Sequence, residues 1–108
     1  MATTYKVLGQ SAPAATSNTD LYTVPAATAA VCSTLSICNR GVDTSFRVAI
    51  RPAGATIADE HYIVYDNSVE AGDTVFLTLG VTLAATDVVT IYAGTADMSF
   101  SLFGSEIA

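Results

Sequence analysis

The strongest constraint on the fold of this chain is that its apolar residues alternate with polar ones and do not recur with helical spacing. No window of ten or more residues places apolar side chains at i, i+3, i+4 and i+7, the pattern of an amphipathic helix. Thr occurs fifteen times and Val eleven, and both residues favour strands because they are branched at Cβ. The sequence therefore predicts an all-β protein.

Two segments show the alternation clearly. In residues 31–38, Val31, Leu35 and Ile37 share one parity with a serine, and the other parity holds both cysteines. In residues 46–51 three apolar residues alternate with Arg47, Ala49 and Arg51. Because successive side chains of a strand point to opposite faces, each segment predicts a strand with one apolar face. Arg47 and Arg51 are then expected on an outer face.

Six further strands are expected, at Thr4–Leu8, Leu21–Val24, His61–Tyr65, Thr74–Thr82, Asp87–Gly94 and Met98–Phe103. Turn residues separate the segments, at 39–41, 52–54, 66–68, 71–73 and 93–95. A single antiparallel β-sandwich of about eight strands over residues 1–108 fits this spacing, with residues 10–19 as a surface loop after an N-terminal strand. The spacing leaves open whether the sandwich is jelly-roll-like or immunoglobulin-like, and whether residues 84–87 form a helical turn or a loop.

The segment Thr74–Leu83 is long and apolar, with Val75, Leu77 and Leu79 in one register. It is expected to be a central strand, with Gly80 marking a bulge or bend. A small domain with many strand edges is prone to association unless those edges are paired or covered. Oligomerisation is therefore expected.

The two cysteines, Cys32 and Cys38, lie six positions apart within one expected strand. At about 3.3 Å per residue their Cα atoms would be roughly 20 Å apart. A disulfide needs about 4.4 to 6.8 Å. Reduced thiols are therefore expected, and an intramolecular disulfide would require the strand assignment to be wrong.

Charge argues against several classes of partner. Four basic and ten acidic residues give a net charge of -6, which disfavours nucleic acids and anionic membranes. The uncharged stretch Leu21–Asn39 contains too many polar residues for a membrane span. Residues Met1–Gln10 lack the basic and apolar regions of a secretory signal, so synthesis in the cytoplasm is expected.

No pattern of catalytic, cofactor-binding or metal-binding residues is found, and a non-enzymatic protein is expected. His61 is the one histidine, and G-x-S-x-G, C-x-x-C and glycine-rich phosphate loops are absent. Carboxylates in or near expected loops could bind calcium or simply keep the domain soluble, and the sequence favours solubility: Asp59, Glu60, Asp66, Glu70, Asp73 and Asp87. Most of the nine aromatic residues are expected in the core.

A family resemblance adds to this interpretation. The segments Leu21–Ala26 (LYTVPA), Ser33–Gly41 (STLSICNRG) and Phe46–Pro52 (FRVAIRP) resemble the first half of small β-sandwich structural proteins of tailed-phage virions. Glu70–Leu79, Leu83–Tyr92 and Phe103–Ile107 resemble the same family's second half, so the likeness runs from about Tyr5 to Ile107. These segments are signatures of turns and strands and bring no catalytic residues with them.

The resemblance implies a virion protein that decorates or cements the capsid and works as a symmetric homo-oligomer. A trimer is favoured, with the major capsid protein or other virion proteins as partners. The interface is expected either at the strand that carries Val75, Leu77 and Leu79 or at the Arg47 and Arg51 face, although the two arginines could equally be ordinary surface residues. The alternative is a tail-tip, collar or fibre module that binds a receptor or carbohydrate, which would show exposed tyrosines clustered at one loop end.

Overall fold

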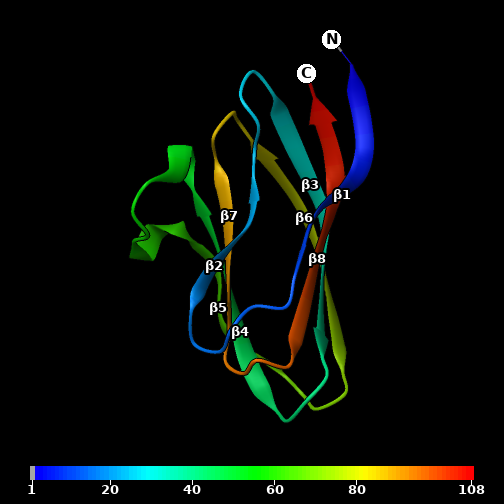
Figure 1. Cartoon of the computed structure of the whole chain (residues 1–108), viewed down its shortest axis with the longest axis vertical. Coiled ribbons are helices and arrows are strands. Elements are labelled where there is room, and N and C mark those ends of the chain that lie inside the picture. Colours follow the sequence, from blue (N-terminus) through cyan, green and yellow to red (C-terminus); the bar gives the residue numbers. More distant parts are fainter. Residues whose placement is uncertain (1) are drawn as a thin grey trace.

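In the computed structural model, which describes residues 2–108, two four-stranded antiparallel sheets pack face to face (Figure 1). This confirms the predicted β-sandwich. The eight strands are β1 (Thr3–Ser11), β2 (Asn18–Thr23), β3 (Ala29–Asn39), β4 (Thr44–Arg51), β5 (Tyr62–Val69), β6 (Thr74–Leu83), β7 (Val88–Ala93) and β8 (Met98–Ile107).

The strand order is that of a jelly roll. Sheet A has the order β1-β8-β3-β6, and sheet B has the order β2-β7-β4-β5. The pairs β1·β8, β2·β7, β3·β6 and β4·β5 are those of one long antiparallel hairpin rolled into two sheets. Of the two arrangements that the sequence leaves open, the jelly-roll order is the observed one.

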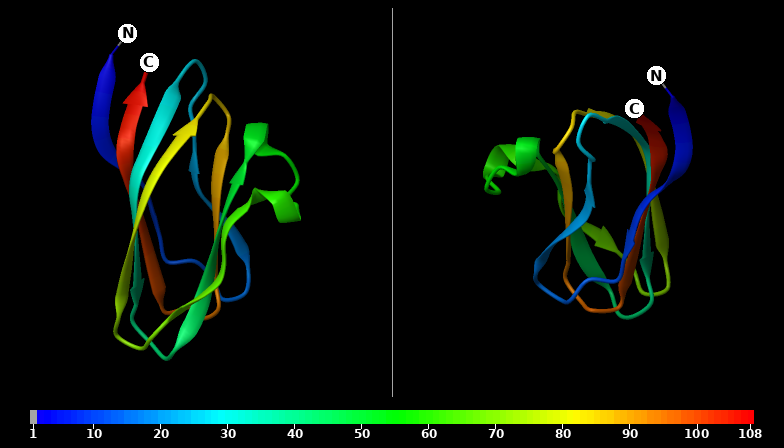
Figure 2. Two further views of the ribbon diagram at one scale, coloured as in Figure 1. Left: turned by 180° about the vertical axis from the view of Figure 1, so that it is seen from behind. Right: turned by 45° about the horizontal axis from the view of Figure 1, so that its top comes forward.

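Two short 3-10 helices are the helical elements of residues 2–108. They are η1 (Pro52–Gly54) and η2 (Asp59–His61), and both lie in the connection between β4 and β5. This connection projects from the side of sheet B (Figure 2). Within the described residues, no helix has the length and apolar character needed to cross a membrane.

The core fills the space between the sheets. It is built from alternate residues of the strands, among them Phe46 and Val48 of β4 and Phe100 and Leu102 of β8, all fully buried. The rings of Phe46 and Phe100 meet edge to face, with 6.3 Å between their centroids. The alternation in residues 46–51 thus predicted the inner face of β4 correctly.

In β3 the predicted parity is wrong in the first half of the strand. Cys32 and Leu35 both point into the core, because a bulge at Ser33 shifts the register between Cys32 and Thr34 against both neighbouring strands. Val31 therefore lies on the outer side. Cys32 and Cys38 are both free, as expected, and burial raises the pKa of the Cys32 thiol to about 11.

The prediction of a central strand at Thr74–Leu83 is also wrong. This segment is β6, an edge strand of sheet A that pairs with β3. Gly80 has φ +81° and lies where the register of β6 against β3 shifts, so the predicted bulge is confirmed. The apolar residues of β6 pack against the core on one face of the strand. One edge of β6 pairs with β3, and the other edge is unpaired.

Some expected turns differ as well. Residues 66–68 lie inside β5, where Asp66 adopts φ 50° at a register shift against β4 and so forms a bulge in place of a turn. Residues 84–87 form a turn without helix. The loop between β1 and β2 covers residues 12–17, since β1 extends to Ser11.

Asn39, at the end of β3, is a buried polar residue that joins two turns. Its Nδ2 donates hydrogen bonds to the carbonyl oxygens of Val42, Val69 and Glu70, at 2.7, 3.2 and 3.1 Å. Its Oδ1 accepts a hydrogen bond from the Gly41 N–H, at 3.0 Å. The side chain thereby ties the β3–β4 turn to the β5–β6 turn.

Candidate functional surfaces

None of the strand residues on the outer face of sheet A is charged among the described residues, and we call this face the neutral face. Arg40, in the turn after β3, reaches one end of it, where its Nε donates a hydrogen bond to Ser99 Oγ at 2.9 Å. The residues of the neutral face follow from the strand registers and are Thr3, Tyr5, Val7 and Gln10 of β1, Ser99, Ser101, Phe103 and Ser105 of β8, Val31, Thr34, Ser36 and Cys38 of β3, and Thr74, Phe76, Thr78 and Thr82 of β6. The solvent-exposed face of a sheet normally carries charged as well as polar side chains. Removing charged groups from water is costly, so a face without charged strand residues is easier to desolvate.

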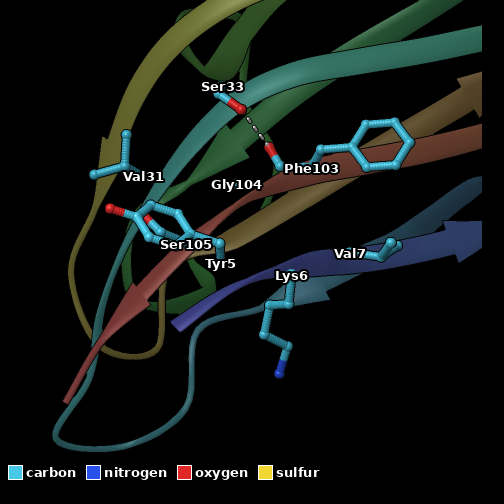
Figure 3. Close-up of a pocket in the computed structure, with 8 residues that line it drawn as sticks. All are labelled: Tyr5, Lys6, Val7, Val31, Ser33, Phe103, Gly104 and Ser105. Carbon is cyan, nitrogen blue, oxygen red and sulfur yellow. Dashed lines mark hydrogen bonds between the residues drawn. The ribbon is translucent and has the colours of Figure 1, made fainter. Parts of the chain in front are cut away.

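A shallow depression of about 520 Å³ lies on the neutral face, where β1, β8 and β3 run side by side (Figure 3). Its walls include Tyr5 and Val7 of β1 and Val31 of β3. The Ser33 hydroxyl donates a hydrogen bond to the Phe103 carbonyl oxygen, at 3.1 Å. A Cβ at Gly104 would overlap the Val31 carbonyl oxygen, so only glycine allows β3 and β8 to approach this closely here.

Lys6 and Glu106 lie in strands of sheet A but turn away from the neutral face. The Lys6 side chain extends away from the other residues of the depression (Figure 3), and its Nζ lies 3.2 Å from Glu106 Oε1. Glu106 Oε2 accepts a hydrogen bond from the hydroxyl of Tyr22 in sheet B, at 2.6 Å. This hydrogen bond, with the help of Lys6, lowers the pKa of Glu106. Glu106 thus links the two sheets, and neither it nor Lys6 lies on the neutral face.

The outer face of sheet B is charged, and both of its arginines have partners within the chain. Arg47 Nε lies 2.6 Å from Asp66 Oδ1, and the guanidinium carbon lies 4.2 Å from the ring centroids of Tyr65 and Tyr92. Arg51 Nη2 lies 2.9 Å from Asp20 Oδ1. Neither arginine therefore needs the carboxylates of a second subunit.

The five predicted interface residues do not form one surface. Arg47 and Arg51 lie on sheet B, whereas Val75, Leu77 and Leu79 are half-buried side chains of β6 that pack against the core from sheet A. The residues of β6 that face outward are those of the other parity, such as Phe76, which is 68% exposed. Whether either group lies at an interface stays a prediction.

A cluster of tyrosines lies beside η2. The rings of Tyr62 and Tyr65 meet edge to face with 5.0 Å between their centroids, and with Asp59 they line an open pocket of about 460 Å³. Several aromatic side chains are thus outside the core, contrary to expectation: Tyr5, Tyr65 and Phe76 are exposed. The clustering brings together residues from η2 and β5, next to Arg47 of β4.

His61 and the loop carboxylates do not converge. His61 Nδ1 accepts a hydrogen bond from the Ala58 N–H, at 3.0 Å, and so helps to shape η2. Within residues 2–108 no three His, Cys, Asp or Glu side chains come close enough together to hold a metal ion.

No protein-family model, curated protein or solved structure matches the chain.

Proposed function

We propose that the protein is a non-enzymatic structural component of a tailed-phage virion that decorates or cements the capsid. The observation that supports this most is the neutral face, together with the jelly-roll strand order, an architecture that recurs in viral capsid proteins. In this proposal the protein is made in the host cytoplasm and then assembles on the virion. It acts as a homo-oligomer whose subunits bind the major capsid protein or another virion protein.

The neutral face suits permanent docking for an electrostatic reason. Burying an unpaired charge in an interface costs several kcal/mol, whereas hydroxyl groups can pair with neighbouring backbone, and exposed aromatic rings gain from losing water. With a net charge of -6, the chain keeps its charges on turns, on sheet B and between the sheets. The neutral face is then available for contact with a partner, and the charged remainder of the surface keeps the protein soluble.

Placing a charge on the neutral face tests this proposal. Val7→Lys is expected to weaken binding of the protein to virions of the encoding phage at least tenfold, because docking would bury the new ammonium group. The matched control is Ile63→Lys in β5 of sheet B, since Val7 and Ile63 are both 46% exposed. Binding is measured by co-sedimentation with particles depleted of the protein, and immunogold labelling locates it on untreated particles. Equal binding by the two variants, or virions without the protein, would overturn the proposal.

A second candidate function rests on the tyrosine cluster. Aromatic faces beside a carboxylate are typical of carbohydrate sites, because sugar C–H groups stack on the rings and hydroxyl groups donate to the carboxylate. Tyr62, Tyr65 and Asp59 provide this combination. We propose it as the alternative: a tail-tip, collar or fibre module that binds a receptor glycan.

A glycan array tests the alternative. The protein is expected to bind a subset of glycans, and Tyr65→Ala is expected to abolish that binding because it removes the exposed ring. Val7→Lys, on the opposite sheet, should bind as the unsubstituted protein does. An array without signal, or a signal that Tyr65→Ala leaves unchanged, would exclude this site.

A further inference from the structure

The four edge strands of the sandwich differ in how they are protected against pairing with another chain. Charged residues, bulges and short length all block such pairing. Strand β1 carries Lys6 and a bulge, the six-residue β2 carries Asp20, and β5 carries Asp66 at a bulge. Strand β6 has ten residues with neither charge nor proline. Its bulge at Gly80 lies in the second half, and its first half, Thr74–Thr78, pairs with β3 without interruption.

We propose that β6 binds β6 of a second copy of this chain, antiparallel and about a two-fold axis at Phe76. The two copies of sheet A would then form one eight-stranded sheet with a continuous neutral face. This inference names the subunit contact that the proposed function assumes, and it rests on that function only for its role in the virion. Its test uses the purified protein alone, so its failure is distinguishable from failure to bind particles.

The side chains of β6 suit this register on both faces. Phe76, which is 68% exposed, would lie opposite Phe76 of the second copy, with Cβ atoms about 4.5 to 5.5 Å apart. On the inner face Val75 would lie opposite Leu77. Both are half-buried because the sheet ends at β6, and an added strand would continue the sheet past them. Gly80 ends the regular ladder.

The charges of the two copies also permit the contact. Each copy has a net charge of -6, so most surfaces would repel one another. Along β6 no charges meet. The nearest carboxylates, one Asp73 in each copy, would lie at opposite ends of the ladder, roughly 20 Å apart at about 3.3 Å per residue. Since the same surface is used in both copies, the contact closes at two subunits. A dimer is therefore expected in place of the trimer that the resemblance favours.

Cross-linking tests the register. In a Cys38→Ser background, where Cys32 is buried, Phe76→Cys treated with a short bis-maleimide is expected to give a covalent dimer on a denaturing gel. The control is Val42→Cys in the β3–β4 loop, because Val42 is 67% exposed and Phe76 is 68% exposed. The control should stay monomeric on the gel. Equal cross-linking of the two variants would overturn the proposed register.

Sedimentation velocity tests the dimer itself. The unsubstituted protein should sediment as a dimer across the micromolar range, and Phe76→Lys should sediment as a monomer because two ammonium groups would face each other. Phe76→Leu should remain dimeric. Circular dichroism confirms that each variant is folded, which is expected at an exposed position. A monomer or a trimer of the unsubstituted protein, or a dimer of Phe76→Lys, would overturn the inference.

Discussion

Replacing Phe46 with alanine is expected to lower the free energy of unfolding by about 3–5 kcal/mol. Phe46 of β4 is completely buried, and its ring meets Phe100 of the opposite sheet edge to face. The substitution removes the apolar contacts of the ring and leaves a cavity that the two sheets cannot close without losing their ladders. Because a domain of this size is stable by only about 5–15 kcal/mol, a large part of its stability would be lost.

Chemical denaturation monitored by circular dichroism measures this effect. Tyr5→Ala provides the matched control, since it also removes an aromatic ring but from an exposed position of β1. Its effect should stay within about 0.5 kcal/mol. If Phe46→Ala were as mild as Tyr5→Ala, the packing described between the two sheets would be wrong.

Replacing Asn39 with alanine is expected to lower the free energy of unfolding by about 2–4 kcal/mol, the second large effect. The carbonyl oxygens of Val42, Val69 and Glu70 would lose their amide donor, and the Gly41 N–H would lose its acceptor. A buried polar group without a partner costs about 1–3 kcal/mol, and water admitted to the turns would recover part of the loss. The same denaturation experiment measures the change.

Asn39→Asp separates the hydrogen bonds from the volume of the side chain. The carboxylate has nearly the shape of the amide but would present an oxygen where three carbonyl oxygens now accept hydrogen bonds. At neutral pH it should therefore destabilise the protein more than Asn39→Ala. Asn67→Ala, at an exposed position of β5, should have little effect. An aspartate variant as stable as the unsubstituted protein would contradict the described network.

Local patterns predicted the strands well where the pairing is regular. Phe46, Val48 and their neighbours alternate without interruption, so the inner face of β4 was predicted correctly. In β3 the residue Ser33, which is extra against β8, reverses the parity, and nothing in the sequence near Ser33 marks a bulge. Residues 66–68 of β5 resemble a turn in sequence, because Asp and Asn are common in turns. The same residue types also tolerate positive φ, which Asp66 adopts in a bulge.

The position of β6 at an edge could not be predicted, since strand order depends on pairing between segments that are distant in the sequence. The neutral face, however, left a signal in the charge pattern. The runs 21–39, 74–86 and 98–105 contain no charged residue. They include β3 and β6 and the part of β8 that precedes Glu106, three adjacent strands of sheet A.

The rolled-hairpin order of the strands also constrains how the chain can fold. Among the described strands, β4·β5 is the one paired set of neighbours in the sequence, and each further pair encloses the one before it. Closing a long loop costs more conformational entropy than closing a short one, so pairing is easiest outward from the segment between β4 and β5. The contact between Lys6 and Glu106, which are 100 positions apart, would then form among the last. Until β3 joins it, β6 has two unpaired edges and no charge to keep other chains away, so this chain is most exposed to aggregation between the formation of the β4·β5 hairpin and the pairing of β3 with β6.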